Sequence, residues 1–172
     1  MTERDIDAEI HMALDCSGSM TGDKIEQAKR IKTVFTEAML ALGDDVIGHL
    51  WAFSSKAIYD YGRVSRESGF VTAEGEEANS DTHMLAHVGG KLAKSRKRRR
   101  VLLVLGDDGP DDLRMAAEMS QQLLARGIVV VHLLVGVHGT PDIYPFELIY
   151  TSMQECLDQF GDLLETIIKH LK

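Results

Sequence analysis

The chain has 172 residues, a length that suits one domain. Its composition, 44% hydrophobic and 27% charged, is typical of a globular protein, and its net charge of −8 argues against a general nucleic-acid-binding protein. The acidic N-terminus does not resemble a secretory signal, and no apolar run approaches the roughly 20 residues that a membrane-spanning helix needs. With Cys16 and Cys156 as its only cysteines, we expect a reduced, cytoplasmic protein that does not associate with membranes.

The first half of the chain alternates between strand-like and helix-like patterns. "AEIHMAL" predicts a strand, and apolar residues at steps of three and four over residues 24–42 predict an amphipathic helix. "DVIGHLWAF" predicts a second strand, and "KAIYDYGRV" predicts an edge strand paired with it. Residues 65–80 are polar and contain glycine, so we expect a loop there, followed by a helix over 82–94 that contains two adjacent glycines.

The second half continues the alternation. We expect a strand in "RRRVLLVLG", a helix over 112–126, a strand in "IVVVHLLVG", a short strand in "YPFELIY" and a final helix over 153–171. Unbroken apolar runs are typical of strands buried on both faces, and helical crossovers require parallel neighbours. The sequence therefore predicts an α/β fold with a doubly wound, mostly parallel sheet, helices on both faces and one antiparallel edge strand.

Polar side chains follow the ends of two predicted strands. Asp15 ends the first strand and is followed by Ser17 and Ser19, while Asp107 follows the strand "RVLLVLG". In a doubly wound sheet, ligands bind beyond the carboxyl ends of the strands, where the strand order reverses. Between these segments in sequence, "NSDTHM" supplies further amide, hydroxyl and carboxylate groups where a helix is expected to begin.

Carboxylate and hydroxyl oxygens together suit a hard divalent cation. Octahedral Mg²⁺, which keeps water ligands readily, fits this oxygen set best, with Mn²⁺ or Ca²⁺ as alternatives. Serine and threonine hydroxyls are neutral, so a site with few carboxylates leaves positive charge on the ion. Such an ion attracts an acidic group from another molecule.

The stretch "DCSGSM" resembles the Asp-x-Ser-x-Ser signature of the von Willebrand factor A (VWA) domain, which carries a metal-ion-dependent adhesion site (MIDAS). Asp15, Ser17 and Ser19 match the signature residue by residue. The resemblance covers roughly residues 8–171 and implies that residues 1–172 form a single VWA-like domain. It also implies a metal site completed by a threonine from a second loop and an aspartate from a third.

The third loop of many intracellular VWA domains reads Thr-Asp-Gly-x-Pro. In this chain "GDDGP" places Asp107 at the aspartate position, and the sequence departs from the pattern with Gly106 for the threonine and Asp108 for the glycine. The resemblance implies that Asp107 is a ligand. The two departures keep open the reading of a degenerate site that holds no metal.

The second loop has three candidates, which we rank Thr82, Asp81 and then Asn79. Thr82 has the family's chemistry at the start of the right helix. The stretch 79–107 also resembles the cobaltochelatase T-subunit and related bacterial VWA domains, and in that register Asn79 or Asp81 occupies the ligand region. This likeness implies a separate AAA+ ATPase as partner, because the chain itself has no GxxxxGK[ST] motif.

Other features have simpler interpretations. The basic run 94–100 reads as a solvated helix end on the side opposite the metal rather than a nucleic-acid site. His83 and His87 have zinc-like spacing without a third ligand, so we expect a surface pair.

Neighbouring carboxylates disfavour a thiolate at Cys16, which argues against cysteine catalysis. Asp15 and the serines could also form only a turn that caps the first helix.

The sequence therefore predicts a non-enzymatic, metal-ion-dependent protein-interaction module whose partner supplies an Asp or Glu to the metal. Two alternatives remain at this stage. One is a Mg²⁺-dependent phosphoryl-transfer enzyme on a doubly wound sheet, which usually needs a second aspartate near the first, where this chain offers Ser17 and Ser19. The other is a metal-free scaffold.

Overall fold

A computed structural model of the chain describes residues 6–16, 20, 22–54, 57–66, 81–106, 113–136 and 144–171. These ranges contain a six-stranded sheet of order β3-β2-β1-β4-β5-β6. The strands are β1 (Ala8–Asp15), β2 (Val46–Phe53), β3 (Ile58–Arg63), β4 (Arg99–Gly106), β5 (Ile128–Val135) and β6 (Glu147–Tyr150). Only β3 runs antiparallel to its neighbour, which confirms the predicted mostly parallel sheet with one antiparallel edge strand.

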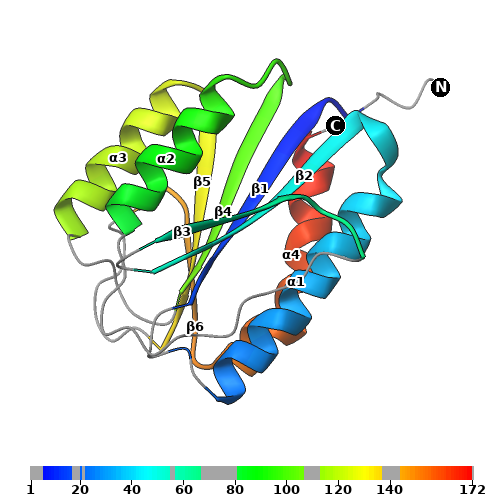
Figure 1. The fold of residues 1–172 in the computed structure, drawn as a ribbon, viewed down its shortest axis with the longest axis vertical. Coiled ribbons are helices and arrows are strands. Elements are labelled where there is room, and N and C mark those ends of the chain that lie inside the picture. The colour runs from blue at the N-terminus through cyan, green and yellow to red at the C-terminus, as the bar shows by residue number, and fades with distance from the viewer. Residues whose placement is uncertain are drawn as a thin grey trace.

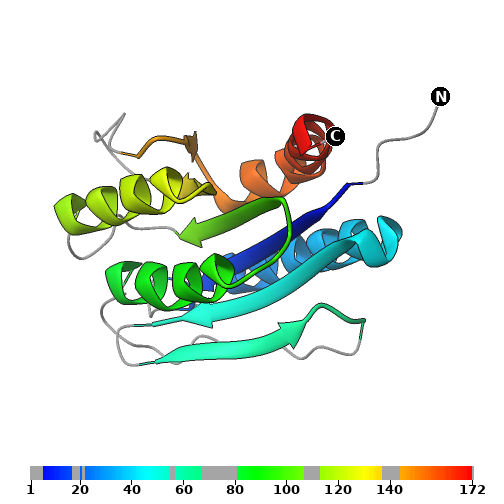
Figure 2. The same cartoon turned by 90° about the horizontal axis from the view of Figure 1, so that it is seen from above.

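The helices form a layer on each face of the sheet (Figures 1 and 2). They are α1 (Asp23–Ala41), α2 (Asp81–Ala93), α3 (Leu113–Ala125) and α4 (Met153–Leu171), with a single 3-10 turn, η2 (Gly43–Asp45), after α1. Helices α1 and α4 pack together on one face, and α2 and α3 pack together on the other. The predicted α/β fold is confirmed, and each element expected from the sequence has a counterpart; most of the expected loop 65–80 lies outside the described residues.

Strand periodicity divides the interior into two cores. In β1, Ile10, Met12 and Leu14 belong to the core beneath α1 and α4. Ala13 belongs to the second core, beneath α2 and α3. Because successive side chains of a strand point to opposite faces, Asp15 has the parity of Ala13 and lies on the α2 side of the sheet.

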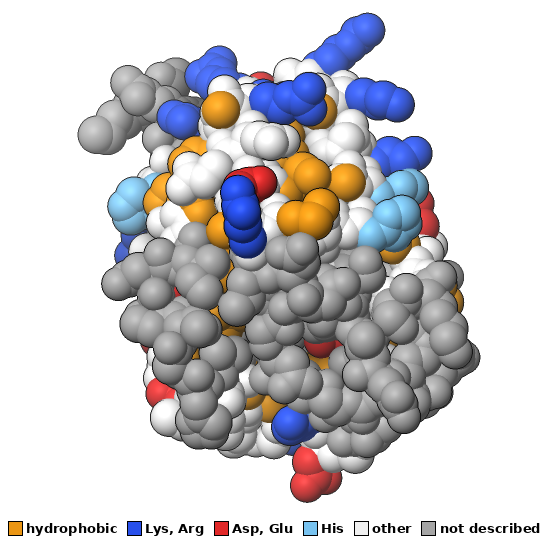
Figure 3. Space-filling model, turned by 90° about the vertical axis from the view of Figure 1, so that its left-hand side faces the viewer, with side chains coloured by type: hydrophobic (Ala, Val, Ile, Leu, Met, Phe, Trp, Pro, Cys, Tyr) orange, Lys and Arg blue, Asp and Glu red, His pale blue; other side chains and the backbone are white. Residues whose placement is uncertain are grey.

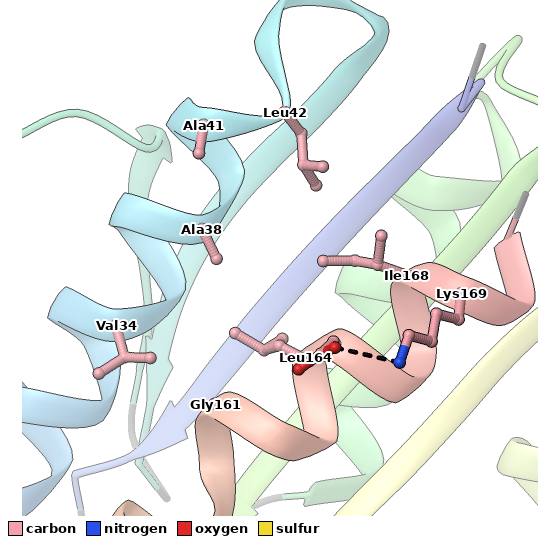
Figure 4. Close-up of a pocket in the computed structure, with 9 residues that line it drawn as sticks. Val34, Ala38, Ala41, Leu42, Gly161, Leu164, Ile168 and Lys169 are labelled. Atoms are coloured by element: carbon pink, nitrogen blue, oxygen red, sulfur yellow. Dashed lines mark ion pairs between the residues drawn. The ribbon is translucent and has the colours of Figure 1, made fainter. Parts of the chain in front are cut away.

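Helices α1 and α4 leave an apolar cavity of about 400 Å³ between them (Figure 4). Ala38 of α1 and Leu42, the residue after α1, face Leu164 and Ile168 of α4 across it. A 3.0 Å ion pair joins Lys169 Nζ to Glu165 Oε1 beside the cavity. Among the helices in the described ranges, none combines the length and apolar character that a bilayer crossing requires. The cytoplasmic location stays a prediction.

Two histidines, His11 of β1 and His132 of β5, are buried inside strands. Trp51 Nε1 donates to His11 Nδ1 at 2.9 Å, so the proton of the neutral ring lies on Nε2, which donates to Glu9 at 2.8 Å. His132 in β5 is fully buried, lies 3.0 Å from Ser120 Oγ through Nε2, and stacks on the ring of Tyr144. Burial lowers the pKa of His132 to about 3.

The adjacent glycines of α2 differ in their surroundings, and we expect them to respond oppositely to alanine. A Cβ at Gly90 meets nothing within 4 Å, whereas a Cβ at Gly89 would lie 2.6 Å from Leu123 Cδ2 of the buried α2–α3 contact. Gly90→Ala should raise the free energy of unfolding by about 0.5–1 kcal/mol through helix propensity. Gly89→Ala should lower it, because Leu123 must move. Urea denaturation of both variants measures the two changes in the free energy of unfolding. Equal changes would contradict the close contact between Gly89 and Leu123.

The buried imidazole of His132 should make stability depend on pH. Its pKa is about 3 in the folded chain and near 6.5 when exposed. Between these values the unfolded chain binds a proton that the folded chain does not, so this contribution is present above pH 6.5 and is lost as the pH falls toward 3. In His132→Gln, the slope of unfolding free energy against pH should fall by up to about 1.4 kcal/mol per pH unit in this window. An unchanged slope in His132→Gln would contradict the buried, neutral imidazole.

Candidate metal centre

The carboxyl ends of β1 and β4 lie side by side in the sheet. Leu14 pairs with Leu105 in a parallel register, so the strands' last residues, Asp15 and Gly106, end at the same level. The chain that continues into the third predicted loop therefore leaves the sheet next to Asp15. This is also the point where the strand order reverses, the usual ligand position in a doubly wound sheet.

The first turn of α2 lies toward the same edge. The end of α2 leads through residues 94–98 to the start of β4 at the opposite, amino edge, so α2 runs antiparallel to β4 (Figure 1). Met84 and Leu85, one turn into α2, share a buried cluster with Ala13, two residues before Asp15. The structure thus brings the start of α2 to the end of β1, as the sequence-based site requires.

Three of the seven predicted ligands can be placed. Asp15, Asp81 and Thr82 lie in the described part of the chain, whereas Ser17, Ser19, Asn79 and Asp107 lie outside it. Asp15 is fully buried, and Asp81 is 5% exposed. Both are carboxylates in surroundings where an ionised group is costly unless it is paired or bound to a cation. The seven-residue ligand set therefore stays a prediction.

Thr82 provides the clearest indication that a ligand atom belongs here. Its Oγ1 is buried and has no hydrogen-bond partner within the described ranges. A buried hydroxyl without a partner costs about 1–3 kcal/mol, and coordination of a cation by its oxygen would remove that cost. Two carboxylates and this hydroxyl are a donor set that fits a hard cation such as Mg²⁺. Among the described residues, no three His, Cys, Asp or Glu side chains gather in a metal-binding group.

Two residues that the sequence analysis did not assign to the site fix the chain beside Asp15. The amide and thiol of Cys16 both donate to the carbonyl oxygen of Phe53, at 2.9 and 3.2 Å. Ser54 N donates to Ala57 O at 2.9 Å, and its Oγ accepts from Ala57 N at 3.3 Å. Because Phe53 pairs with Asp15, the Cys16 contacts hold the ends of β1 and β2 together, whereas the Ser54 contacts lie in the connection from β2 to β3. In the sequence, the only indication of a role for Cys16 and Ser54 is that each follows the last residue of a strand.

Two competing features of the sequence have the surroundings of surface groups. His83 and His87 are exposed on α2, as expected for a surface pair. The basic run sits at the amino end of β4, where Figure 3 shows Lys and Arg side chains gathered at the top of the face. There Lys97 Nζ lies 3.2 Å from Asp7 Oδ1, and Arg100 Nη2 donates to Arg126 O at 2.7 Å. The run is thus far from the candidate metal centre, as predicted.

Comparisons with known proteins show the fold. No family model and no curated protein sequence matches the chain. Proximal thread matrix protein 1 (PTMP1) from the mussel byssus, with a zinc-occupied MIDAS motif, has 14% identity and a TM-score of 0.72, and covers 94% of this chain. The SpRpn10 VWA domain has 9% identity, a TM-score of 0.69 and 92% coverage. The vWF domain of the pilus tip protein Mfa5 from Porphyromonas gingivalis has 10% identity, a TM-score of 0.74 and 99% coverage.

These likenesses establish a VWA-type fold for the chain, and the predicted likeness to the cobaltochelatase T-subunit finds no support in them. The match extends over 94% of the SpRpn10 domain and 98% of the Mfa5 domain. The chain spans only 46% of PTMP1 and 31% of the pilus adhesin SpaC from Lactobacillus rhamnosus GG, which it also resembles.

Replacement of Thr82 by valine should stabilise the metal-free protein. Valine keeps the side-chain shape and removes a buried hydroxyl that lacks a partner in the described ranges, so the free energy of unfolding should rise by about 1 kcal/mol. Thr166→Val is the control, because that exposed hydroxyl donates to Asp162 O at 2.9 Å and its loss should bring no gain. Urea denaturation in the presence of a chelator measures both; a clear destabilisation by Thr82→Val would contradict the unpartnered state.

Proposed function

We propose that the chain is a protein-interaction module that works through a bound divalent cation. Asp15, Ser17, Ser19 and Asp107 hold the ion together with one residue at the start of α2, for which Thr82 ranks before Asp81 and Asn79. An Asp or Glu of a partner protein fills the remaining coordination position. The proposal depends mainly on Asp15, which is buried at the end of β1 and beside the end of β4. The first turn of α2 lies toward the same edge, and its Thr82 hydroxyl has no hydrogen-bond partner in the described ranges.

The charge of the site explains why it would select an acidic partner. Hydroxyl ligands are neutral, so an ion held by few direct carboxylates keeps part of its positive charge. The chain as a whole carries a net charge of −8, so an acidic partner is attracted at the ion and repelled by the rest of the surface on average. A contact through one metal-bound carboxylate therefore selects a partner with an Asp or Glu at one position, and not any partner with a high negative charge.

The comparisons support the interaction role and a divalent metal. PTMP1 holds zinc in its MIDAS motif, and SpaC is a pilus adhesin. We propose Mg²⁺ as the ion, with Mn²⁺ and Ca²⁺ as alternatives and Zn²⁺ added by the example of PTMP1. An AAA+ ATPase as the partner, and a cytoplasmic setting, remain part of the proposal from the sequence alone.

A Mg²⁺-dependent phosphoryl-transfer enzyme is the alternative from another class, and the residues around Asp15 do not favour it. Such enzymes need a second acid and a cation that clamps the phosphate. The neighbour Cys16 has its thiol committed to Phe53 O, and the basic run lies at the opposite edge of the sheet.

Metal binding can be tested on the chain alone. Mg²⁺ or Mn²⁺ should bind with measurable heat and raise the melting temperature, with a stabilisation of about 2.7 kcal/mol at a metal concentration of 100 times Kd. Asp15→Asn should abolish both effects, and Thr82→Val should weaken them. Asp45→Asn is the matched control, because Asp45 is exposed in η2. If the titration produces no heat and the melting temperature does not change, metal binding is contradicted and the metal-free scaffold is supported.

The open coordination position has its own test. Mn²⁺ bound with exchangeable water should enhance the relaxation of water protons, and added acetate, as a minimal carboxylate, should reduce that enhancement by displacing water. A generic phosphate ester serves as the counter-test: turnover that requires Asp15 would support the enzyme and contradict the interaction module.

A further inference from the structure

We propose that the stacked rings of His11, His49 and Trp51 form an acid-sensitive contact that holds the edge strand β3 on the sheet. His11 of β1 is level with His49 of β2 in the parallel register, and Trp51 lies two residues further along β2, on the same face as His49. The ring centroids of His11 and His49 are 4.6 Å apart, and so are those of His49 and Trp51. The inference goes beyond the metal-dependent function, because this ring cluster contains none of the predicted metal ligands.

The hydrogen bonds of His11 are compatible only with a neutral imidazole. The indole Nε1 of Trp51 is a donor and never an acceptor, and it lies 2.9 Å from His11 Nδ1, which therefore carries a lone pair. A second proton on the imidazole has to go to this Nδ1, and two N–H groups would then face each other. Both residues are buried, His11 at 2% and Trp51 at 1% exposed, so water cannot replace the lost hydrogen bond while the rings stay in place. Protonation of His11 therefore requires that the rings move apart.

The side of the ring cluster toward β3 is the side that can move. The side chain of His49 is 20% exposed, and its Nε2 lies 2.6 Å from Asp60 Oδ1 of β3. Asp60 also accepts from the amide of Gly62 at 2.7 Å, so one carboxylate links the rings to the backbone of β3. Strand β3 contains no buried residue and pairs only with β2, at the end of the strand order (Figure 2). Separation of β3 is therefore the opening with the lowest free-energy cost.

The charged groups around the ring cluster set the direction of the response. Besides the two histidines they are Glu9 on β1, Asp60 on β3, His87 and Lys91 on α2, and Arg100 of β4, which is level with Glu9. Burial lowers the pKa of His11 from its ordinary value of 6.5, the hydrogen bond to Glu9 raises it in part, and charge on His49 lowers it further. An exposed His11 thus binds a proton that the closed cluster resists. The stabilisation is present above pH 6.5 and is lost as the pH falls below that value.

The fluorescence of Trp51 reports on the ring cluster without a label, because Trp51 is the only tryptophan of the chain. Titration of the full chain from about pH 8 to about pH 4 should shift its emission, while the far-UV circular dichroism stays native. The midpoint should lie below 6.5. Over the same range, NMR should show the loss of cross-strand NOEs between β2 and β3, whereas those between β1 and β4 persist.

Two variants separate His11 from the other titrating groups. Glutamine can accept from Trp51 and donate to Glu9 but has no titrating ring, so His11→Gln should abolish the emission shift and keep β3 paired at low pH. His170→Gln is the matched control, because His170 is exposed on α4, and it should keep the wild-type transition.

Four results would overturn the proposal. A transition that persists in His11→Gln would exclude His11 as the titrating group. Emission that changes only together with the far-UV signal would show global unfolding instead of a local opening. NOEs between β2 and β3 that survive the change at Trp51 would separate the ring cluster from β3. If His11→Gln does not fold, imidazole NMR of the wild type at neutral pH still decides, since an Nδ1–H tautomer of His11 would contradict its contact with Trp51.

Discussion

The parallel pairing of β1 with both β2 and β4 is the constraint on which the rest of the structure depends. It places three strand ends, Asp15, Phe53 and Gly106, at one edge of the sheet. The chain then leaves β1 toward α1 on one face, and α3, which follows β4, lies on the other face. The two connections diverge at this point, and the space between them is where a doubly wound sheet binds ligands.

Burial gives this edge its chemical character. Asp15 is fully enclosed, so its carboxylate has lost most of the water that stabilises its charge. The contacts of Cys16 with Phe53 O hold the next residue in the same place. A carboxylate in such surroundings is costly unless it is paired or bound to a cation, which is consistent with a place in a cation site.

The hydroxyl groups of the helical threonines differ in their hydrogen bonding. Thr33 and Thr166 return their hydroxyls to the carbonyl four residues earlier, at 3.1 and 2.9 Å, as helical threonines commonly do. Thr36 and Thr82 are helical as well, but their buried hydroxyls have no partner in the described ranges. Thr82 lies in the first turn of α2, at the candidate metal centre, whereas Thr36 lies in the third turn or later of α1.

The sequence by itself determined the elements and their class. Unbroken apolar runs such as "RVLLVLG" and three- and four-residue steps such as those of α4 depend only on local periodicity, so strands, helices and the doubly wound sheet could be predicted. Asp15 could be proposed as a site residue because it ends a buried strand, and the start of α2 because its polar residues match the second loop that the VWA resemblance implies.

Only the tertiary structure decided which of these groups meet and in what environment. The register of β1 against β4, the burial of Asp81, and the lack of a partner for the Thr82 and Thr36 hydroxyls all depend on contacts between segments far apart in the sequence. Burial and partner are properties of the packed molecule, and no local pattern encodes them.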